Sequence, residues 1–575
     1  MKGHVFVAPG DLTQLSAHAL AYSASNALGR DGNLYSAFEA NVPGFATWYD
    51  GLRHARKGPC EVGDTFWMPL GRERAPHGLV VVASAGGPRT PEDKAGLAVR
   101  AALTEAVRRL REEVRLEGRL LVALPAFRLG KGGDRRERLR SARAQVRAAL
   151  DVLAQHEGVD AVFVPYTATL HQIFLEARRE VLGEPGAGEE TFPELERALL
   201  ARECVLFVGA GLSSGAGLPD WAALVRRLAE DLGVNPDAPA DYLDLAQWHR
   251  EKFGPERLAR VLRETYSAPS LPTLGHYLLT ALPVQQVITT NYDDLVERAL
   301  AAQKRYPIKV VRQGDVAGTG RGGVYVIKLH GDAAQAEEVV LTRDDYDEFF
   351  QRRPAMALLL EGLLLNRTFF FVGYGLRDPN FRQVYHRIAR MLREAKRPAF
   401  ATTFEAAGEG GAYLTRQWHN KQLQLIAIPG ADRAEQGQQF LRFLDRLADR
   451  VTMGRRRLFL APEVEVPPGL GPLRGLLAEG VAREVAALGE RDLARAGGRT
   501  AVRYLAEVLD FLTEQGWRPT ANNGWDLCRL WEYLADHAAG PAERRRFLIA
   551  ALETAEAFAD VRRVRQRLAE LEGKH

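Results

Sequence analysis

The segment CVLFVGAGLSSGAGLPDWAALVRRLAEDL (204–232) indicates the fold of this chain most directly. A short apolar run enters the glycine-rich stretch GAGLSSGAG (209–217), and a stretch with apolar residues at helical spacing follows. Glycines let a backbone approach a pyrophosphate, and unpaired N–H groups at a helix start bind anions. The segment therefore predicts a strand, a dinucleotide-binding loop and a helix. A glycine-rich turn that binds no ligand would have the same pattern, so both interpretations stay open.

Further apolar runs place this segment in a larger α/β organisation. Four of them precede it, at 4–8, 78–84, 119–125 and 160–165. Four more follow it, at 284–290, 324–330, 368–374 and 423–429. Short apolar runs separated by helical stretches predict α/β domains with buried, mostly parallel sheets.

Two segments divide the chain into three blocks. GEPGAGEE (183–190) is the first, and the stretch from MGRRR (453–457) to PPGLGP (467–472) is the second. The last block shows only helical periodicity, so an all-α fold is expected there. We therefore expect two α/β domains at 1–182 and 192–452, and a helical domain at 470–575.

Composition narrows the classes of protein. The 77 Lys and Arg residues nearly balance the 73 Asp and Glu residues, so the charge gives no direct evidence for nucleic-acid binding. No apolar run reaches the roughly 18–20 residues of a membrane span, and the first residues do not resemble a secretory signal. Cys60, Cys204 and Cys528 form no CxxC pair. We therefore expect a cytoplasmic protein that binds no metal and has no zinc module.

Four motifs in the central block occur in the order found in sirtuins. They are GAGLSSGAGLPDW (209–221), ITTNYDDL (288–295), IKLHGD (327–332) and FVGYGLRDPNF (371–381). Together with LTRDDYDEFF (341–350), they resemble the bacterial sirtuin-like (SIR2-like) NADases of antiphage defence. The resemblance implies a Rossmann-like parallel-sheet domain with NAD as its substrate.

The resemblance assigns catalytic roles to two residues. Asn291 matches the asparagine that orients ribose or water, and His330 matches the family base. An amide donates and accepts hydrogen bonds without adding charge, and an imidazole titrates near neutrality. From the residues alone, His330 could equally make a structural hydrogen bond, and Asn291 could cap a turn.

Further residues are expected to bind the dinucleotide. The resemblance places the phosphates at the glycine-rich loop, the nicotinamide side at Asp293 and the adenosine half at Gly373 and Asp378. Turn capping is the alternative for both aspartates. The full expected set is Gly209, Ala210, Gly211, Ser213, Asp220, Asp293, Gly373 and Asp378.

The N-terminal block resembles a macrodomain in two stretches. VFVAPGDLTQLSAHALAYSASNALGRDGNL (5–34) resembles the opening of that family, and LPAFRLGKGGDRRERLRSA (124–142) resembles its later phosphate loop. The resemblance implies an α/β/α domain that binds an ADP-ribose derivative through Asp11, Asn26, Gly130, Gly132 and Gly133. A macro-like scaffold without a ligand is the alternative, and the basic run at 131–140 also fits a solvated helix face.

Three functions follow from these patterns. The first is an NAD glycohydrolase for antiphage defence, switched by an ADP-ribose-derived signalling nucleotide at the N-terminal domain. It would act as a homo-oligomer, with the helical block as an oligomerisation surface or a surface for an operon-encoded partner protein. The second is an ADP-ribosyltransferase whose macro-like domain reads or erases the mark. The third is a non-enzymatic nucleotide-binding assembly module.

Overall fold

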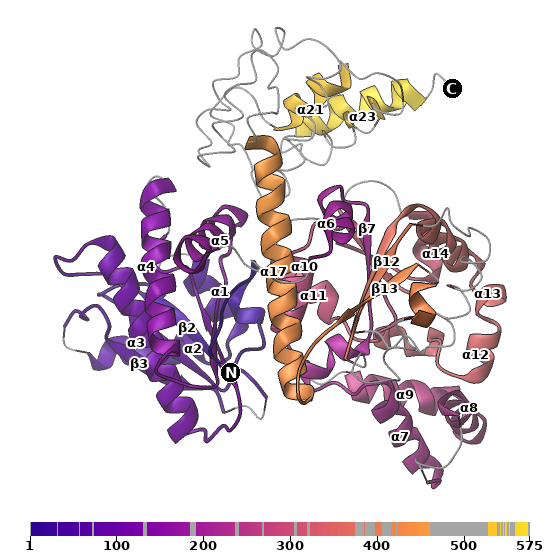
Figure 1. The fold of residues 1–575 in the computed structure, drawn as a ribbon, viewed down its shortest axis with the longest axis horizontal. Helices are drawn as coiled ribbons and strands as arrows, with labels where there is room; N and C mark the ends of the chain where they lie inside the picture. Colours follow the sequence, from indigo (N-terminus) through magenta and orange to yellow (C-terminus); the bar gives the residue numbers. More distant parts are fainter. Residues whose placement is uncertain are drawn as a thin grey trace.

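The structure is a computed structural model with two α/β domains and a separate group of helices (Figure 1). It describes residues 2–30, 33–56, 58–71, 74–129, 135–183, 191–235, 241–266, 270–303, 308–318, 323–373, 397–404, 416–420 and 422–460, together with residue 385 and parts of 527–572.

The N-terminal domain is built on a six-stranded sheet with the order β1-β6-β5-β2-β4-β3. All its neighbouring strands pair in parallel except β3 and β4. The strands are β1 (Val5–Val7), β2 (Ala19–Ala24), β3 (Thr65–Pro69), β4 (Gly78–Ala83), β5 (Leu120–Leu124) and β6 (Val159–Phe163). Four of these strands confirm apolar runs seen in the sequence. β2 and β3 were not predicted, because small and polar residues interrupt ALAYSA and β3 is an edge strand.

Helices cover both faces of this sheet because alternate strand residues point to opposite sides. Phe6, Leu20 and Tyr22 pack on the side of α1 (Asn33–Asn41) and α2 (Phe45–Ala55). Val5, Val7, Ala19 and Ala21 pack on the opposite side. The helices there are α3 (Pro91–Glu112), α4 (Arg135–Leu153) and α5 (Ala168–Leu182). The expected three-layer α/β/α fold is confirmed.

The central domain contains a parallel seven-stranded sheet with the order β13-β12-β11-β7-β8-β10-β9. Its strands are β7 (Cys204–Val208), β8 (Gln286–Thr289), β9 (Ile308–Val311), β10 (Val324–Lys328), β11 (Thr368–Val372), β12 (Ala399–Thr403) and β13 (Leu423–Ala427). The glycine-rich segment thus follows a central strand. The expected Rossmann-like parallel sheet is confirmed, although β9 and β12 were not predicted.

Two helical layers cover the central sheet. One contains α6 (Pro193–Leu200), α10 (Leu274–Thr280), α11 (Leu295–Gln303) and α17 (Arg433–Leu460). The other contains α12 (Arg343–Asp347), α13 (Phe349–Arg352) and α14 (Pro354–Asn366). Helices α7 (Trp221–Leu232), α8 (Tyr242–Phe253) and α9 (Pro255–Tyr266) form a projecting module (Figure 1).

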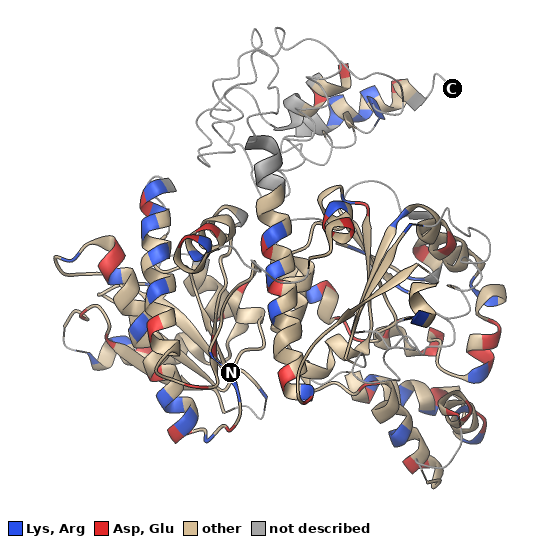
Figure 2. Cartoon of the chain, viewed as in Figure 1, with Lys and Arg blue, Asp and Glu red and all other residues tan. Residues whose placement is uncertain are grey.

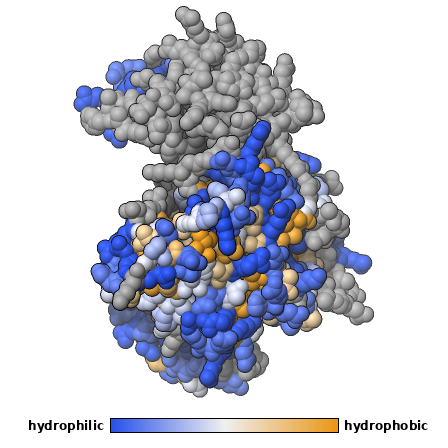
Figure 3. Space-filling view, turned by 90° about the vertical axis from the view of Figure 1, so that its left-hand side faces the viewer, coloured by the Kyte–Doolittle hydropathy of each residue, from blue (hydrophilic) through white to orange (hydrophobic). Residues whose placement is uncertain are grey.

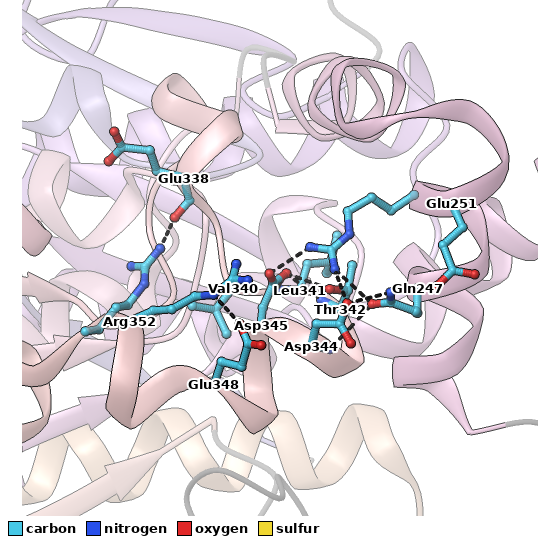
Figure 4. A network of polar contacts seen from close by, with 12 residues as sticks. Gln247, Glu251, Glu338, Val340, Leu341, Thr342, Asp344, Asp345, Glu348 and Arg352 are labelled. Atoms are coloured by element: carbon cyan, nitrogen blue, oxygen red, sulfur yellow. Dashed lines mark hydrogen bonds and ion pairs between the residues drawn. The ribbon is translucent and has the colours of Figure 1, made fainter.

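The projecting module is held to the domain by the segment LTRDDYDEFF. Arg250 of α8 pairs with Asp344 and Asp345 at 2.9 and 2.8 Å, and Gln247 donates to Asp344 (Figure 4). Asp345 also accepts the backbone N–H groups of Leu341 and Thr342. The carboxylates of this motif therefore have a structural role, because they join α8 to α12.

Helix α17 lies between the two sheets (Figure 1). It runs through MGRRR (453–457), where the sequence predicts a domain boundary, so the helix continues beyond residue 452. The expected domain limits stay a prediction. Its buried Asp445 and Asp449 bind Arg178 of α5 at 2.6 and 3.0 Å, and His4 contacts Asp445 at 2.9 Å. A continuous apolar cluster also includes residues of both α/β domains.

The charged surface shows both signs on most helices (Figure 2). Arg140, the last residue of the basic run at 131–140, pairs with Glu92 at 3.1 Å, and Arg143 farther along α4 pairs with Glu180 at 2.9 Å. These surface ion pairs favour a solvated helix face. Hydrophilic side chains predominate on the side of the molecule that carries the N-terminal domain (Figure 3). Within the described residues, no helix combines the length and apolar character needed to cross a membrane.

The described part of the C-terminal block contains helices α21 (Leu527–Asp536) and α23 (Phe558–Glu572). Trp531 is buried and its ring lies 5.9 Å from that of Phe547. Glu532 of α21 pairs with Arg563 and Arg567 of α23. The expected helical fold is confirmed for these residues.

Candidate functional site

Four adjacent parallel strands bring the sirtuin-like motifs to one edge of the central sheet. The register aligns Val208 with Thr289 and Val372, and Thr289 with Lys328. Gly209, Asn291, His330 and Gly373 each follow these positions by one or two residues. Carboxyl ends of parallel strands share an edge, which is where ligands bind in open α/β sheets. The strand order thus unites motifs separated by up to about 160 residues of sequence.

The glycine-rich loop packs directly against the turn at Gly373. Gly211 donates its N–H to the Gly373 carbonyl at 2.9 Å, and Gly209 donates to the Val372 carbonyl at 3.0 Å. A Cβ on Gly373, whose φ is +61°, would lie 2.5 Å from the backbone nitrogen of Leu212. Gly211 and Gly373 are thus required for this close approach, because a side chain on either would collide with backbone atoms.

The N–H groups of this loop differ from the expectation that they are unpaired. Those of Gly209 and Gly211 bind β11 and its following turn, and that of Ser213 donates to the Ala210 carbonyl at 3.0 Å. In this arrangement the loop presents the Ser213 hydroxyl and the Gly209 carbonyl to Asn291. The phosphate contacts predicted for Gly209, Ala210, Gly211 and Ser213 stay predictions.

Asn291 has a defined amide orientation. Its amide nitrogen Nδ2 lies 3.3 Å from the Gly209 carbonyl and 3.1 Å from the Ser213 hydroxyl. A carbonyl oxygen only accepts, so the atom facing it must be the NH₂ group. The Asn291 side-chain oxygen Oδ1 is buried and has no hydrogen-bond partner among the described residues. Buried polar atoms in folded proteins are usually paired, so this oxygen is available to accept a hydrogen bond from a ligand or a water molecule.

A buried ion pair between Lys328 and Glu297 supports the loop that contains Asn291. Lys328 of β10 is fully buried, donates to the Asp293 carbonyl, and lies 3.1 Å from Glu297 of α11. Burial raises the pKa of Glu297 above its usual range, although Lys328 opposes this effect. Lys328 therefore fixes the position of the 290–294 loop from the protein interior.

His330 lies in a buried turn directly after β10. Its exposed fraction is 3%, and its ring packs edge-on against Tyr346 with centroids 5.3 Å apart. Gly331 has a φ of +90°, and a Cβ there would lie 3.1 Å from Val339. The Tyr292 hydroxyl donates to the Val340 carbonyl at 2.7 Å, which joins the asparagine loop to the histidine loop.

The predicted aspartates have capping contacts. Asp293 accepts the Leu295 N–H at 3.0 Å, and exposed Asp220 accepts the Ala223 N–H at 2.8 Å as the N-cap of α7. The turn capping that was the alternative for Asp293 is therefore present. The ligand-binding roles of Asp293 and Asp220 stay predictions. Asp378 lies outside the described residues.

Three residues at this site were missed by sequence reasoning. Burial raises the pKa of Tyr266, and the nearby carboxylates of Asp293 and Asp220 raise it further. His276 contacts Ser213, and Lys328 holds the asparagine loop. Only Lys328 had a local signal, because a lysine in an otherwise apolar strand must be paired when it is buried.

The N-terminal residues lie at the carboxyl edge of their own sheet. Asp11 follows β1 and Asn26 follows β2, whereas Gly130, Gly132 and Gly133 lie outside the described residues. The Asp11 carboxylate accepts the N–H and the hydroxyl of Thr13 at 2.9 and 2.6 Å. Asn26 packs against Gly86. Ligand binding by this set stays a prediction.

Metal-ligating side chains do not cluster in the described residues, where no group of three or more His, Cys, Asp or Glu is placed to hold an ion. Cys60 and Cys204 are both buried and free.

Residues 285–426, which include the segments with Asn291 and His330, match the family model described as "SIR2-like domain". The chain is 32% identical over 205 residues to "NAD(+) hydrolase ThsA" of Cytobacillus dafuensis, covering 36% of this chain and 42% of that protein. It is 34% identical over 185 residues to the protein of that name from Acinetobacter baumannii, covering 32% and 38%. Less than half of each relative's length is therefore matched.

The chain is also similar to a second protein named for defence and, in its fold, to a macrodomain. "Defense-associated sirtuin 2" of Bacillus subtilis is 27% identical over 276 residues, which are 47% of this chain and 26% of that protein. The Oceanobacillus iheyensis macrodomain with ADP is 14% identical and covers 32% of this chain and 96% of that structure. Its TM-score is 0.27.

Proposed function

We propose that this chain is an NAD glycohydrolase whose reaction takes place at the edge formed by Asn291 and His330. The observation that carries the proposal is the buried Asn291 carbonyl oxygen, which lacks a hydrogen-bond partner among the described residues while its NH₂ group is held by Gly209 and Ser213. The similarity to proteins named NAD(+) hydrolase supports NAD as the substrate.

The proposed reaction breaks the bond between ribose C1′ and the nicotinamide nitrogen, whose electron pair leaves with nicotinamide. Water forms the new bond to C1′ and loses a proton, so the products are nicotinamide, ADP-ribose and H⁺. Asn291 would accept a hydrogen bond from this water or from a ribose hydroxyl, and His330 would receive the proton. The partial negative charge on the amide oxygen also favours a ribose that gains positive charge in the transition state.

The direct test incubates the purified full chain with NAD and separates the products chromatographically. We expect nicotinamide and ADP-ribose in equal amounts, with rates about 100-fold or more lower in Asn291→Ala and His330→Ala. Asp294→Asn is a matched control in the same loop, because the Asp294 side chain is 65% exposed. Full activity in Asn291→Ala would contradict the proposal, as would NAD that stays intact with all added nucleotides.

Transfer of ADP-ribose to a macromolecule is the competing outcome. NAD labelled on its adenylate phosphate distinguishes the two reactions. Hydrolysis leaves the label in free ADP-ribose, whereas label retained on protein or nucleic acid after denaturation would identify a transferase.

We further propose that a nucleotide bound at the N-terminal domain regulates NAD cleavage. Asp11 and Asn26 follow parallel strands of the same sheet, and the Asp11 backbone contacts the central domain through Tyr277. We expect an ADP-ribose derivative bound there to change the rate of NAD cleavage, with NAD depletion as the antiphage effect. Calorimetric titration of wild type and Asp11→Ala with cyclic and linear ADP-ribose tests the binding step. Equal affinity in both proteins would contradict this assignment.

The assembly state belongs to the proposal as well. The expected homo-oligomer and operon-encoded partner are assigned to the helical block that begins near residue 470. Light scattering on the purified chain would show a multiple of 63.6 kDa if the chain self-associates.

A further inference from the structure

His276 of α10 connects the centre of the molecule to the glycine-rich loop. Its ring is fully buried, and its Nε2 lies 3.4 Å from the Ser213 hydroxyl. Ser213 in turn lies 3.1 Å from the Asn291 amide nitrogen. The three side chains thus form a buried row that ends at the residue assigned to the reaction.

The opposite side of the imidazole determines which nitrogen carries the proton. The Thr273 backbone N–H lies 3.1 Å from Nδ1, and the Thr273 hydroxyl lies 2.8 Å from it. A backbone N–H can only donate, so Nδ1 must be the acceptor. A neutral imidazole then carries its proton on Nε2, which faces Ser213. Burial lowers the pKa of His276 to about 3, so the ring is neutral near physiological pH.

This tautomer determines how Ser213 is used. His276 donates from Nε2 and Asn291 donates from Nδ2, so the Ser213 oxygen accepts from both. Its own proton remains for an acceptor elsewhere. The Asn291 NH₂ group is occupied by Ser213 and the Gly209 carbonyl, and the amide therefore presents Oδ1 outward from these two partners.

Helix α10 holds His276 firmly in this position. Every residue of Leu274–Thr280 is buried. A Cβ on Gly275 would lie 3.1 Å from Leu212 of the glycine-rich loop and 3.5 Å from Leu441 of α17. Close packing on both sides leaves the helix little freedom to move relative to the loop.

We propose that His276 is a positioning residue for NAD cleavage, which acts through Ser213 to keep the Asn291 amide in its reactive orientation. This inference rests on the proposed function. If the His276 donor is lost, the Ser213 hydroxyl can rotate and donate elsewhere, so the Asn291 amide loses a fixed partner. The effect should appear in kcat, because NAD contacts elsewhere in the site are unchanged.

Two amide substitutions test the two nitrogens of the ring separately. In His276→Gln the terminal NH₂ takes the place of Nε2–H and still donates to Ser213. The shorter side chain in His276→Asn replaces only the acceptor Nδ1 and leaves no donor for Ser213. We expect kcat to fall roughly 10- to 100-fold in His276→Asn, with the affinity for NAD unchanged. His276→Gln should recover much of that loss, although both variants remove a buried ring and should unfold at similarly lowered temperatures.

A double-mutant cycle tests whether the effect passes through Ser213. In a Ser213→Ala background, His276→Asn should cause no further fall in kcat. Equal kcat in the Asn and Gln variants, or full additivity with Ser213→Ala, would overturn the inference. Failure of the proposed function is distinguishable, because then wild type and Asn291→Ala would both leave NAD intact.

Discussion

The hydroxyl of Tyr277 donates a hydrogen bond of 2.7 Å to the backbone carbonyl of Asp11. This bond joins the central domain to the residue expected to bind the nucleotide signal. Tyr277 is fully buried, and burial raises the pKa of its hydroxyl well above the usual range. Because the neighbouring residue His276 faces Ser213, one short helix contacts both candidate nucleotide sites.

Tyr277→Phe should weaken communication between the two domains. The substitution removes the hydroxyl and leaves the Asp11 carbonyl without this donor, at a cost of about 1–3 kcal/mol. We expect a smaller change in NAD cleavage when an ADP-ribose derivative is added, measured as the ratio of rates with and without it. Tyr35→Phe is the matched control, since the Tyr35 hydroxyl is buried without a hydrogen-bond partner among the described residues. An unchanged ratio in Tyr277→Phe would contradict coupling through this bond.

Gly10→Ala should disturb the same contact sterically. Gly10 has a φ of +147°, and a Cβ there would lie 2.6 Å from Tyr277 Cε1. Overpacking of this kind costs roughly 1–3 kcal/mol, to which the backbone strain is added. Gly44→Ala controls for the strain, because Gly44 also has a positive φ but its Cβ would meet no atom closer than 3.8 Å. Thermal unfolding should show a larger loss for Gly10→Ala, and equal losses would be inconsistent with the clash.

Arg178→Met should destabilise the interface between α5 and α17. It removes the arginine partner of Asp445, which is 1% exposed, and one of the two arginine partners of Asp449, which is 0% exposed and keeps Arg179 at 2.8 Å. Breaking a buried ion pair costs about 3–5 kcal/mol. Arg143→Met is the control: its partner is Glu180, the two side chains are 34% and 38% exposed, and such pairs contribute about 1 kcal/mol or less. Denaturant unfolding measures the loss of stability in both variants. Similar losses would show that the buried cluster contributes no more than an exposed ion pair.

The stability that this cluster contributes should depend on pH in one direction. Burial by itself would raise the pKa of Asp445, but Arg178 and His4 hold it below its usual range. A carboxylate with a lowered pKa in the folded state stabilises above its unfolded pKa of about 3.9, and this contribution is lost as the pH falls further. In Arg178→Met the pKa of Asp445 should instead be raised. The deficit of the variant should therefore shrink between pH 7 and pH 5, and a constant deficit would contradict the assignment.

Lys328→Met should impair both stability and NAD cleavage. The variant leaves Glu297 buried without its partner and removes the donor to the Asp293 carbonyl, so the loop with Asn291 loses its support. We expect a loss of about 3–5 kcal/mol and a lowered kcat. Lys309→Met, on the neighbouring strand β9, is the control because Lys309 is exposed. Adding Glu297→Gln to Lys328→Met should restore part of the stability, and no recovery would argue against the ion pair as the cause.

Local patterns in the sequence by themselves determined much of this protein. Continuous apolar runs identified nine of the strands, because a strand buried on both faces needs apolar residues at every position. The glycine-rich segment identified the loop after β7, and its close approach to Gly373 explains why glycines are needed there. The four motifs, through their resemblance to those of sirtuins, predict roles for Asn291 and His330.

Only the tertiary structure decided which residues meet. The strand order places β7 between β11 and β8, and this adjacency brings Gly373 and Asn291 to the same loop. Ser213 meets His276 across 63 residues of sequence, and Asp11 meets Tyr277 across 266. No periodicity reports such pairs, because they depend on how separate elements pack. The same packing occupied the loop N–H groups that the sequence had suggested were unpaired, and it placed the buried His276 on the far side of Ser213 from Asn291.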